Sequence, residues 1–182
     1  MLNHVAIYWD LQNVRLKSQG KSRDQVAIYW DWQNVHFKSQ GKFRDKVIAL
    51  VEFAKKLGSV KVMNVYAHWR KETPLVEDTF DDLDFKCRNV PASKAKKNNA
   101  DKKLIKDCQE DISSNPHIST VILLSKDGDF VPLVRELKAA GKKVILISDS
   151  DKTTNQKLKN MVDEFYTLSK SEAGFSPLNV AA

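Results

Sequence analysis

The sequence has few cysteines, glycines and prolines, and it has no long apolar run. Two cysteines, Cys87 and Cys108, are too few for a disulfide framework. Six glycines and five prolines in 182 residues exclude collagen-like and low-complexity chains. The longest apolar runs, such as Val121–Leu124 and Val144–Ile147, are far shorter than the roughly 18 residues that a membrane span needs.

The N-terminus lacks the basic region and the apolar stretch of a secretory signal. We therefore expect a cytoplasmic protein with reduced thiols and no contact with a membrane. A chain of 182 residues buries enough surface to fold without a disulfide or a structural metal. Its length predicts one domain with short additional segments.

Basic residues outnumber acidic residues, by 30 to 23, which gives a net charge of +7. A positive net charge favours an anionic partner, and nucleic acid before any other, because phosphate contacts are electrostatic. Charge of itself does not identify the partner, since many basic domains bind no nucleic acid.

A tandem repeat occupies the first quarter of the chain. Val5–Asp24 and Val26–Asp45 are offset by 21 residues and are identical at 16 of 20 positions. They differ at Leu11/Trp32, Arg15/His36, Leu16/Phe37 and Ser22/Phe43. Two copies are too few for a solenoid, so the repeat indicates a local duplication of one strand and one loop.

The two copies would compete for one position in the fold, because each begins with the buried-strand sequence Val-Ala-Ile-Tyr-Trp. The second copy leads directly into the next helix, so we predict that it forms the first strand. Residues 1–25 are then an extra copy, which forms an added edge strand, a swapped strand or a disordered arm. Its function would be that of a register switch or an oligomerisation device, or else it is a tolerated duplication. A spare strand can pair with the sheet edge of a neighbour, so a homodimer is one expected assembly.

Apolar periodicity after the second copy predicts alternating helices and strands. We predict helices at 45–57, 74–83, 101–113, 130–140 and 155–162, and strands at 59–69, 85–90, 120–125, 143–148 and 164–168. The inner strands are apolar throughout, which is typical of a mainly parallel sheet that helices cover on both faces. The sequence therefore predicts an α/β domain over residues 26–168, followed by a C-terminal tail at residues 169–182.

Carboxylates follow three of the predicted strands, and a further one opens a helix after a basic loop. They are Asp31, then Asp127 with Asp129, then Asp149 with Asp151, and the helix residue Asp101. Parallel sheets place their sites beyond the carboxyl ends of the strands. Several carboxylates in one small space repel each other unless a divalent cation neutralises them, and oxygen ligands suit Mg²⁺ or Mn²⁺.

These motifs resemble one known family. Asp31-x-x-Asn34 follows an apolar strand, Asn99-Ala-Asp101 opens a helix, and Ser125-Lys-Asp-Gly-Asp-Phe precedes Pro132-Leu and Gly141-Lys-Lys-Val. From the second copy to about Leu168, the chain is similar to the NYN domain of the PIN-like nuclease superfamily. The resemblance implies a Rossmann-like three-layer fold, and active members cut RNA with a metal held by an acidic cluster. The family commonly has glycine and an apolar residue where this chain has Asn99-Ala100.

The resemblance implies a metal-dependent ribonuclease that cuts RNA endonucleolytically. The implied catalytic residues are Asp31, Asn34, Asp101, Asp127 and Asp129, of which the four aspartates would hold Mg²⁺ or Mn²⁺ and Asn34 would orient Asp31 or a water. We further interpret Lys94, Lys96, Lys97 and Lys102 as contacts to the RNA backbone, and Trp32 as a residue that could stack a base. Asp10 has the same surroundings in the first copy, so either Asp10 or Asp31 could fill the site.

Each feature also has a structural interpretation. Turns and helix caps could account for two of the pairs, Asp31 with Asn34 and Asp127 with Asp129. Asp101 could interact favourably with the dipole of its helix. Trp32 could pack in the core, the lysine loop could be solvated, and Asp107 reads as a solvated helix residue. A non-catalytic RNA-binding module of the same fold is therefore the alternative function. Asp149-Ser-Asp151 also resembles a haloacid dehalogenase phosphatase motif, but only 31 residues follow it, too few for the rest of that domain.

Overall fold

Strand β1 lies near the centre of a seven-stranded sheet, in which the first six strands run parallel. The computed structural model describes residues 24–36, 43–90, 99–168 and 175–178. The strands are β1 (Gln25–Asp31), β2 (Ser59–Ala67), β3 (Lys86–Asn89), β4 (Ile118–Leu124), β5 (Lys143–Ser148), β6 (Glu164–Leu168) and β7 (Phe175–Leu178). The helices are α1 (Phe43–Leu57), α2 (Pro74–Asp82), α3 (Asn99–Ser114), α4 (Val131–Ala139) and α5 (Gln156–Met161), with short 3₁₀ turns η2 (Trp69–Lys71) and η3 (Gly128–Phe130).

The strand order is β3-β2-β1-β4-β5-β6-β7, so β1 and β4 are neighbours although 86 residues separate the end of one from the start of the other. The first six strands have the order of the doubly wound Rossmann fold. Chain crossovers after β1 and after β4 lead away in opposite directions, and folds of this type bind their ligands beyond the carboxyl ends of the strands at such a reversal. The predicted Rossmann-like three-layer α/β fold is confirmed.

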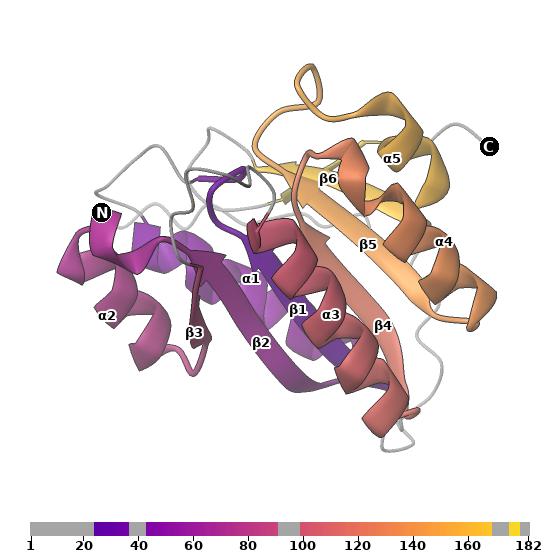
Figure 1. Ribbon diagram of the computed structural model, residues 1–182, viewed down its shortest axis with the longest axis horizontal. Helices are drawn as coiled ribbons and strands as arrows, with labels where there is room; N and C mark the ends of the chain where they lie inside the picture. The colour runs from indigo at the N-terminus through magenta and orange to yellow at the C-terminus, as the bar shows by residue number, and fades with distance from the viewer. Residues whose placement is uncertain (1–23, 37–42, 91–98, 169–174, 179–182) are drawn as a thin grey trace, which may run out of the picture.

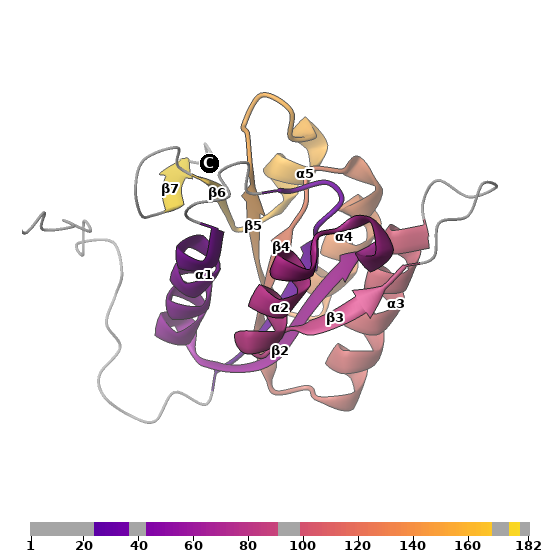
Figure 2. The same cartoon turned by 90° about the vertical axis from the view of Figure 1, so that its left-hand side faces the viewer.

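Helices cover both faces of the sheet, as Figures 1 and 2 show with α1 on one side and α3 and α4 on the other. Successive side chains of a strand point to opposite faces. Val26, Ile28 and Trp30 of β1 therefore pack toward α1 and α2, whereas Ala27 and Tyr29 pack toward α3 and α4. All five are fully buried. Burial on both faces explains why β1 and the neighbouring β4 are apolar throughout.

The elements predicted from periodicity are all present, with ends that differ by at most two residues. Gly141 ends α4 as expected, with a φ of 71°, in the left-handed region that glycine adopts without strain. The predicted strand at 59–69 is shorter than expected, because Trp69 begins η2 instead. The segment predicted as a tail contains β7, which pairs antiparallel with β6.

Residues 1–23 lie outside the described part of the chain, so the first copy of the repeat is described only at its last residue, Asp24. The second copy supplies β1, as predicted. Among the described helices, none combines the length and the apolar character that crossing a bilayer requires.

Candidate functional site

The reversal of strand order between β1 and β4 brings Asp31 close to the loop that follows β4. Asp31 is the last residue of β1 and is 1% exposed. Its Oδ2 accepts hydrogen bonds from the Asn34 side-chain amide and, at 3.2 Å, from the Ser125 hydroxyl. Asn34 belongs to the turn after β1, and Ser125 directly follows β4. The two bonds therefore fix the Asp31 carboxylate at the point where the chain leaves β1 and β4 in opposite directions.

Asp101, Asp127 and Asp129 form a cluster in which one carboxylate oxygen of each residue lies within 4.8 Å of the others. Asp101 stands in the first turn of α3, and Asp127 and Asp129 stand at the start of η3. Asp127 Oδ1 accepts a 3.0 Å hydrogen bond from the backbone N–H of Asp129, so a tight turn holds these two residues. The backbone N–H of Asp127 donates to the Ser125 hydroxyl oxygen at 3.2 Å. Ser125 thus contacts both Asp31 and the loop that carries the cluster.

Burial and mutual repulsion raise the pKa values of the inner carboxylates. Desolvation by burial is the largest cause of the raised pKa of Asp101, which lies at about 7, and the charges of Asp31, Asp127 and Asp129 add to it. Burial also raises the pKa of Asp31, and the charge of Asp127 acts in the same direction. Hydrogen bonds from Asn34 and Ser125 oppose that shift in Asp31. The four aspartates therefore form one electrostatically coupled group, which we call the acidic cluster.

The acidic cluster fits a hard divalent cation. Its members offer only carboxylate oxygens, the ligands that Mg²⁺ and Mn²⁺ prefer. Oδ1 of Asp31 is buried and accepts no hydrogen bond from any described residue. A buried carboxylate oxygen without a donor is costly unless a cation or another donor faces it. Asp101 is buried, Asp127 is half-buried and Asp129 is exposed, so the cluster is open to solvent on one side.

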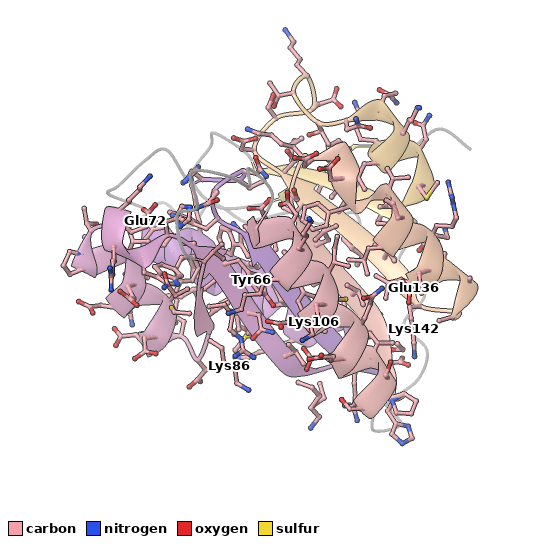
Figure 3. All side chains as sticks on the ribbon, viewed as in Figure 1. Tyr66, Glu72, Lys86, Lys106, Glu136 and Lys142 are labelled. Atoms are coloured by element: carbon pink, nitrogen blue, oxygen red, sulfur yellow. The ribbon has the colours of Figure 1, made fainter. Side chains whose placement is uncertain are left out.

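Two buried tyrosines connect the sheet to helix α3, which carries Asp101. The hydroxyl of Tyr29 in β1 donates to Asp111 Oδ2 at 2.9 Å, and the hydroxyl of Tyr66 in β2 donates to Asp107 Oδ2 at 3.0 Å. Burial raises the pKa of both phenols, so both stay protonated and act as donors at neutral pH. Figure 3 labels Tyr66, which lies on β2 beneath α3. The interpretation of Asp107 as a solvated residue is wrong, because it accepts this bond.

The loop after β5 packs against the loop after β4. The backbone N–H of Asn155 donates to the Lys126 carbonyl at 3.0 Å, and Lys126 Nζ lies 3.4 Å from Asp149 Oδ2. A Cβ atom on Gly128 would meet Asn155 Nδ2 at 2.5 Å, so a larger residue at this position would displace the Asn155 side chain. Asp149, the first aspartate of the motif that resembles a phosphatase, forms an ion pair with Lys126. The close packing holds the loop that carries Asp127 and Asp129.

The residues proposed to contact RNA differ in burial, and some of them lie outside the described residues. Trp32 is 4% exposed, and its ring centroid lies 5.3 Å from those of both Phe43 and Phe80. This packing favours the core interpretation of Trp32, since stacking on a base requires an open ring face. Lys102 is exposed in the first turn of α3, next to Asp101. The remaining predicted contacts and the alternative aspartate lie outside the described residues: Lys94, Lys96, Lys97 and Asp10.

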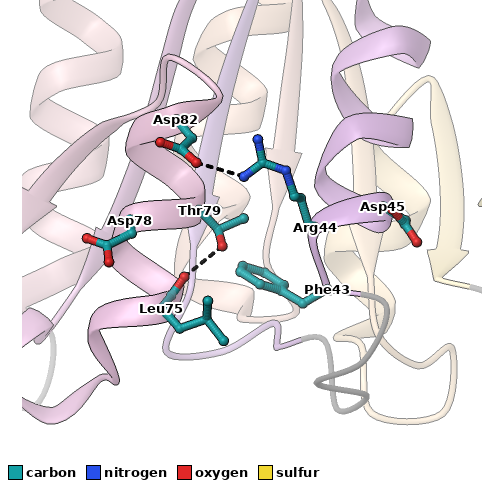
Figure 4. A pocket seen from close by; sticks show the side chains of 7 residues that line it. All are labelled: Phe43, Arg44, Asp45, Leu75, Asp78, Thr79 and Asp82. Atoms are coloured by element: carbon teal, nitrogen blue, oxygen red, sulfur yellow. Dashed lines mark hydrogen bonds and ion pairs between the residues drawn. The ribbon is translucent and has the colours of Figure 1, made fainter.

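A separate pocket lies between α1 and α2, and Figure 4 shows the side chains around it. Phe43 and Leu75 supply apolar surface, and Arg44 forms a 2.8 Å ion pair with Asp82 at its edge. None of the four aspartates of the acidic cluster lines it. Its charged groups are exposed on the surface, so it offers no buried chemistry.

The five residues that the sequence predicts to be catalytic lie together at one edge of the sheet. Asp31 and Asn34 are in contact, and Asp101, Asp127 and Asp129 are clustered. Tyr29 and Tyr66, whose hydroxyls donate hydrogen bonds to α3, were not predicted from the sequence. Their one signal in the sequence was a polar hydroxyl in otherwise apolar strands, which requires a hydrogen-bond partner when it is buried.

Comparisons with known proteins bear on the fold and on the family of this chain. A search of curated proteins found no match. The fold is similar to the crystal structure of a protein of unknown function from Vibrio parahaemolyticus, with a TM-score of 0.65 and 24% identity, covering 84% of this chain and 98% of that chain. That similarity shows the fold alone. The family model of the NYN domain matches residues 25–169, a span that begins at β1 and includes all four aspartates of the acidic cluster. The chain belongs to the NYN domain family.

Proposed function

We propose that the protein is a metal-dependent ribonuclease that hydrolyses phosphodiester bonds within RNA chains. One observation carries the proposal: three carboxylates within 4.8 Å of one another stand beside Asp31 at the strand reversal of an NYN domain. The net charge of +7 supports a nucleic acid as the substrate. In this proposal the protein acts in the cytoplasm, as expected from the sequence.

In this proposal Asp31, Asp101, Asp127 and Asp129 hold Mg²⁺ or Mn²⁺. Such an ion, when bound, lowers the pKa of a coordinated water and offsets the charge of the phosphate. Asn34 and Ser125 hold Oδ2 of Asp31, which leaves Oδ1 as the free ligand atom.

Two further groups of residues have roles in the proposal. Asp101 would ionise when a cation is bound, because positive charge nearby favours the carboxylate and offsets the burial and the repulsion that raise its pKa. Lys102 and the sequence-predicted Lys94, Lys96 and Lys97 bind the RNA backbone.

The alternative is an RNA-binding module that has the fold but no turnover. A module that no longer cuts RNA is free to lose metal ligands, because nothing then balances the repulsion among clustered carboxylates. This chain retains four aspartates at the strand reversal, and two of them have raised pKa values. The retention of this unfavourable arrangement favours catalysis over binding alone.

Cleavage of a labelled single-stranded RNA with Mn²⁺, with Mg²⁺ and with EDTA tests the proposal. The key variant is Asp127→Asn/Asp129→Asn, shown to be folded by circular dichroism. The matched control is Glu77→Gln/Asp78→Asn, which removes the same two charges from the exposed surface of α2. We expect metal-dependent cleavage by the wild type and the control, and a loss of at least about 100-fold in the Asp127/Asp129 variant.

The outcomes separate the two candidate functions. Cleavage that resists EDTA, or that survives in the Asp127/Asp129 variant, would contradict the proposed site. Binding of RNA without cleavage, across several RNAs and both metals, would establish the non-catalytic module instead.

A further inference from the structure

The tandem repeat gives the chain two candidate first strands, and the second forms β1. β1 is enclosed on both edges, because it pairs with β2 on one side and β4 on the other. Helices enclose it on both faces, and its residues from Val26 to Asp31 are at most 1% exposed. A segment can therefore take this position only if every one of its side chains fits.

The first copy meets this requirement at each buried position. Val5–Asp10 has the same sequence as Val26–Asp31, residue for residue. The identity continues at Asn13 and Val14, the equivalents of Asn34 and Val35. Val5–Asp10 would thus fill the same space between β2 and β4, and Asp10 would take the position of Asp31 beside Ser125.

The copies differ at few positions where β1 and its turn make specific contacts. Gln25 Oε1 accepts a 2.7 Å hydrogen bond from Asn115 Nδ2, and the equivalent residue is His4. Trp32 packs its ring against Trp30, Phe43 and Phe80, and the equivalent residue is Leu11. Both differences favour the second copy, and the buried Trp32 ring is the larger loss.

The connection to α1 does not prevent the exchange. With the second copy in place, residues 32–42 connect β1 to α1, and with the first copy in place residues 11–42 would do so. The entropy cost of closing a loop rises only with the logarithm of its length. Phe43 begins α1 in either arrangement, so its contacts with Phe80 remain available.

We propose that Val5–Asp10 and Val26–Asp31 are interchangeable first strands, and that Trp32 sets the preference for the second. The chain then populates two folded arrangements with the same sheet, one with Asp31 and one with Asp10 at the strand reversal. Because β1 is enclosed by β2 and β4, exchange between the arrangements requires this strand to leave the sheet. The inference concerns the sheet and does not depend on the ribonuclease proposal.

Three variants of the full chain test the proposal: Ile28→Asp, Ile7→Asp and the double variant. Ile28 is fully buried, and a charged side chain there excludes its own copy from the sheet. We expect Ile7→Asp to leave the melting temperature unchanged. Ile28→Asp should fold with a lower melting temperature, and the double variant should not fold.

Hydrogen exchange with mass spectrometry identifies the strand in use, because the flanking residues distinguish peptides of the two copies. We expect the amides of Val5–Asp10 to become protected in Ile28→Asp. Two outcomes would overturn the proposal: an Ile28→Asp chain as unfolded as the double variant, or a folded one whose Val5–Asp10 amides exchange freely.

Trp32→Leu tests the preference without placing a charge in the core, since it gives the second copy the residue of the first. We expect protection of Val5–Asp10 to rise severalfold relative to the wild type. Trp69→Leu is the matched control, because Trp69 is also buried and packs on Phe80 but belongs to neither copy. No rise in Trp32→Leu, or an equal rise in the control, would show that Trp32 does not set the preference.

Discussion

The hydroxyl of Ser125 donates a 3.2 Å hydrogen bond to Oδ2 of Asp31, and thereby joins two residues 94 positions apart in the sequence. Ser125 is fully buried, and its oxygen also accepts from the backbone N–H of Asp127. One side chain thus connects the end of β1 to the loop that carries the other carboxylates.

Ser125→Ala should weaken both the fold and the binding of metal. A hydrogen bond to a charged group contributes about 1.5–3 kcal/mol, and we expect a loss of that order in the free energy of unfolding in urea. We also expect the stabilisation by Mn²⁺ to decrease, because Asp31 would lose one of its two hydrogen-bond donors. Ser119→Ala is the control, since Ser119 contacts the Gln25 carbonyl at the opposite end of β1. Equal effects of the two variants on Mn²⁺ binding would contradict this role of Ser125.

The stability of the metal-free protein should fall as the pH rises toward neutrality. Asp101 has a pKa of about 7 in the folded protein, against an ordinary value of 3.8. The folded state therefore binds more protons than the unfolded state between these values, and the free energy of unfolding decreases as the pH rises through this window. Above it, the destabilisation is complete and on the order of a few kcal/mol.

Thermal unfolding in EDTA from about pH 4.5 to about pH 8 would measure this dependence, since the window lies between the two pKa values. Asp101→Asn should lose much of the slope and be more stable than the wild type at the upper end. If both proteins showed the same slope, the shift in Asp101 would not be the cause.

Metal should stabilise the wild type and leave the cluster variant unaffected. A ligand at about 100 times its Kd adds about 2.7 kcal/mol, which corresponds to several degrees in the melting temperature of a domain of this size. We expect this shift with Mn²⁺ or Mg²⁺, and its reversal by EDTA. Asp127→Asn/Asp129→Asn should melt higher than the wild type in EDTA, because repulsion is removed, and should show no shift with metal. Glu77→Gln/Asp78→Asn should retain the wild-type shift, and its loss there would point to binding outside the cluster.

Gly128→Ala should disturb the loop of the acidic cluster through Asn155. The new methyl group would lie 2.5 Å from Asn155 Nδ2, and the Asn155 side chain caps α5 by accepting from the N–H groups of Lys157 and Leu158. Loss of such a cap costs about 0.5–2 kcal/mol, and we expect a destabilisation of that size or more. Asn155→Gly makes room, so the double variant should be less destabilised than the sum of the single variants. Additive effects in a double-mutant cycle would exclude the contact as the cause.

The fold could be predicted largely from the sequence, because short apolar runs such as 120–125 and 143–148 are typical of strands buried on both faces. Element ends were less predictable. Trp69 continued the apolar pattern of β2, yet the chain turns before it so that the ring packs on Phe80. No local pattern specifies that contact, because Phe80 lies on a different helix.

The candidate site was predictable where it depends on strand ends, as for Asp31 and Asp127. The contact between Tyr66 and Asp107 was not, because it depends on how α3 lies across the sheet. Periodicity places Asp107 on one face of α3 but does not say which strand faces it. The occupant of β1 could be predicted from its continuity with α1, although its sequence is duplicated.

The hydrogen bonds from Tyr29 and Tyr66 to α3 also fix the position of the helix, along its own axis, relative to the sheet. Apolar packing alone tolerates small sliding movements, whereas two hydrogen bonds of 2.9 Å and 3.0 Å do not. A register shift by one residue would move each side chain by about 1.5 Å along the helix axis and by about 100° around it, which would carry Asp101 away from its neighbours. The bonds therefore resist the displacement that repulsion among the carboxylates favours. The acidic cluster is therefore preorganised, and the proposed cation would bind without the cost of reassembling it.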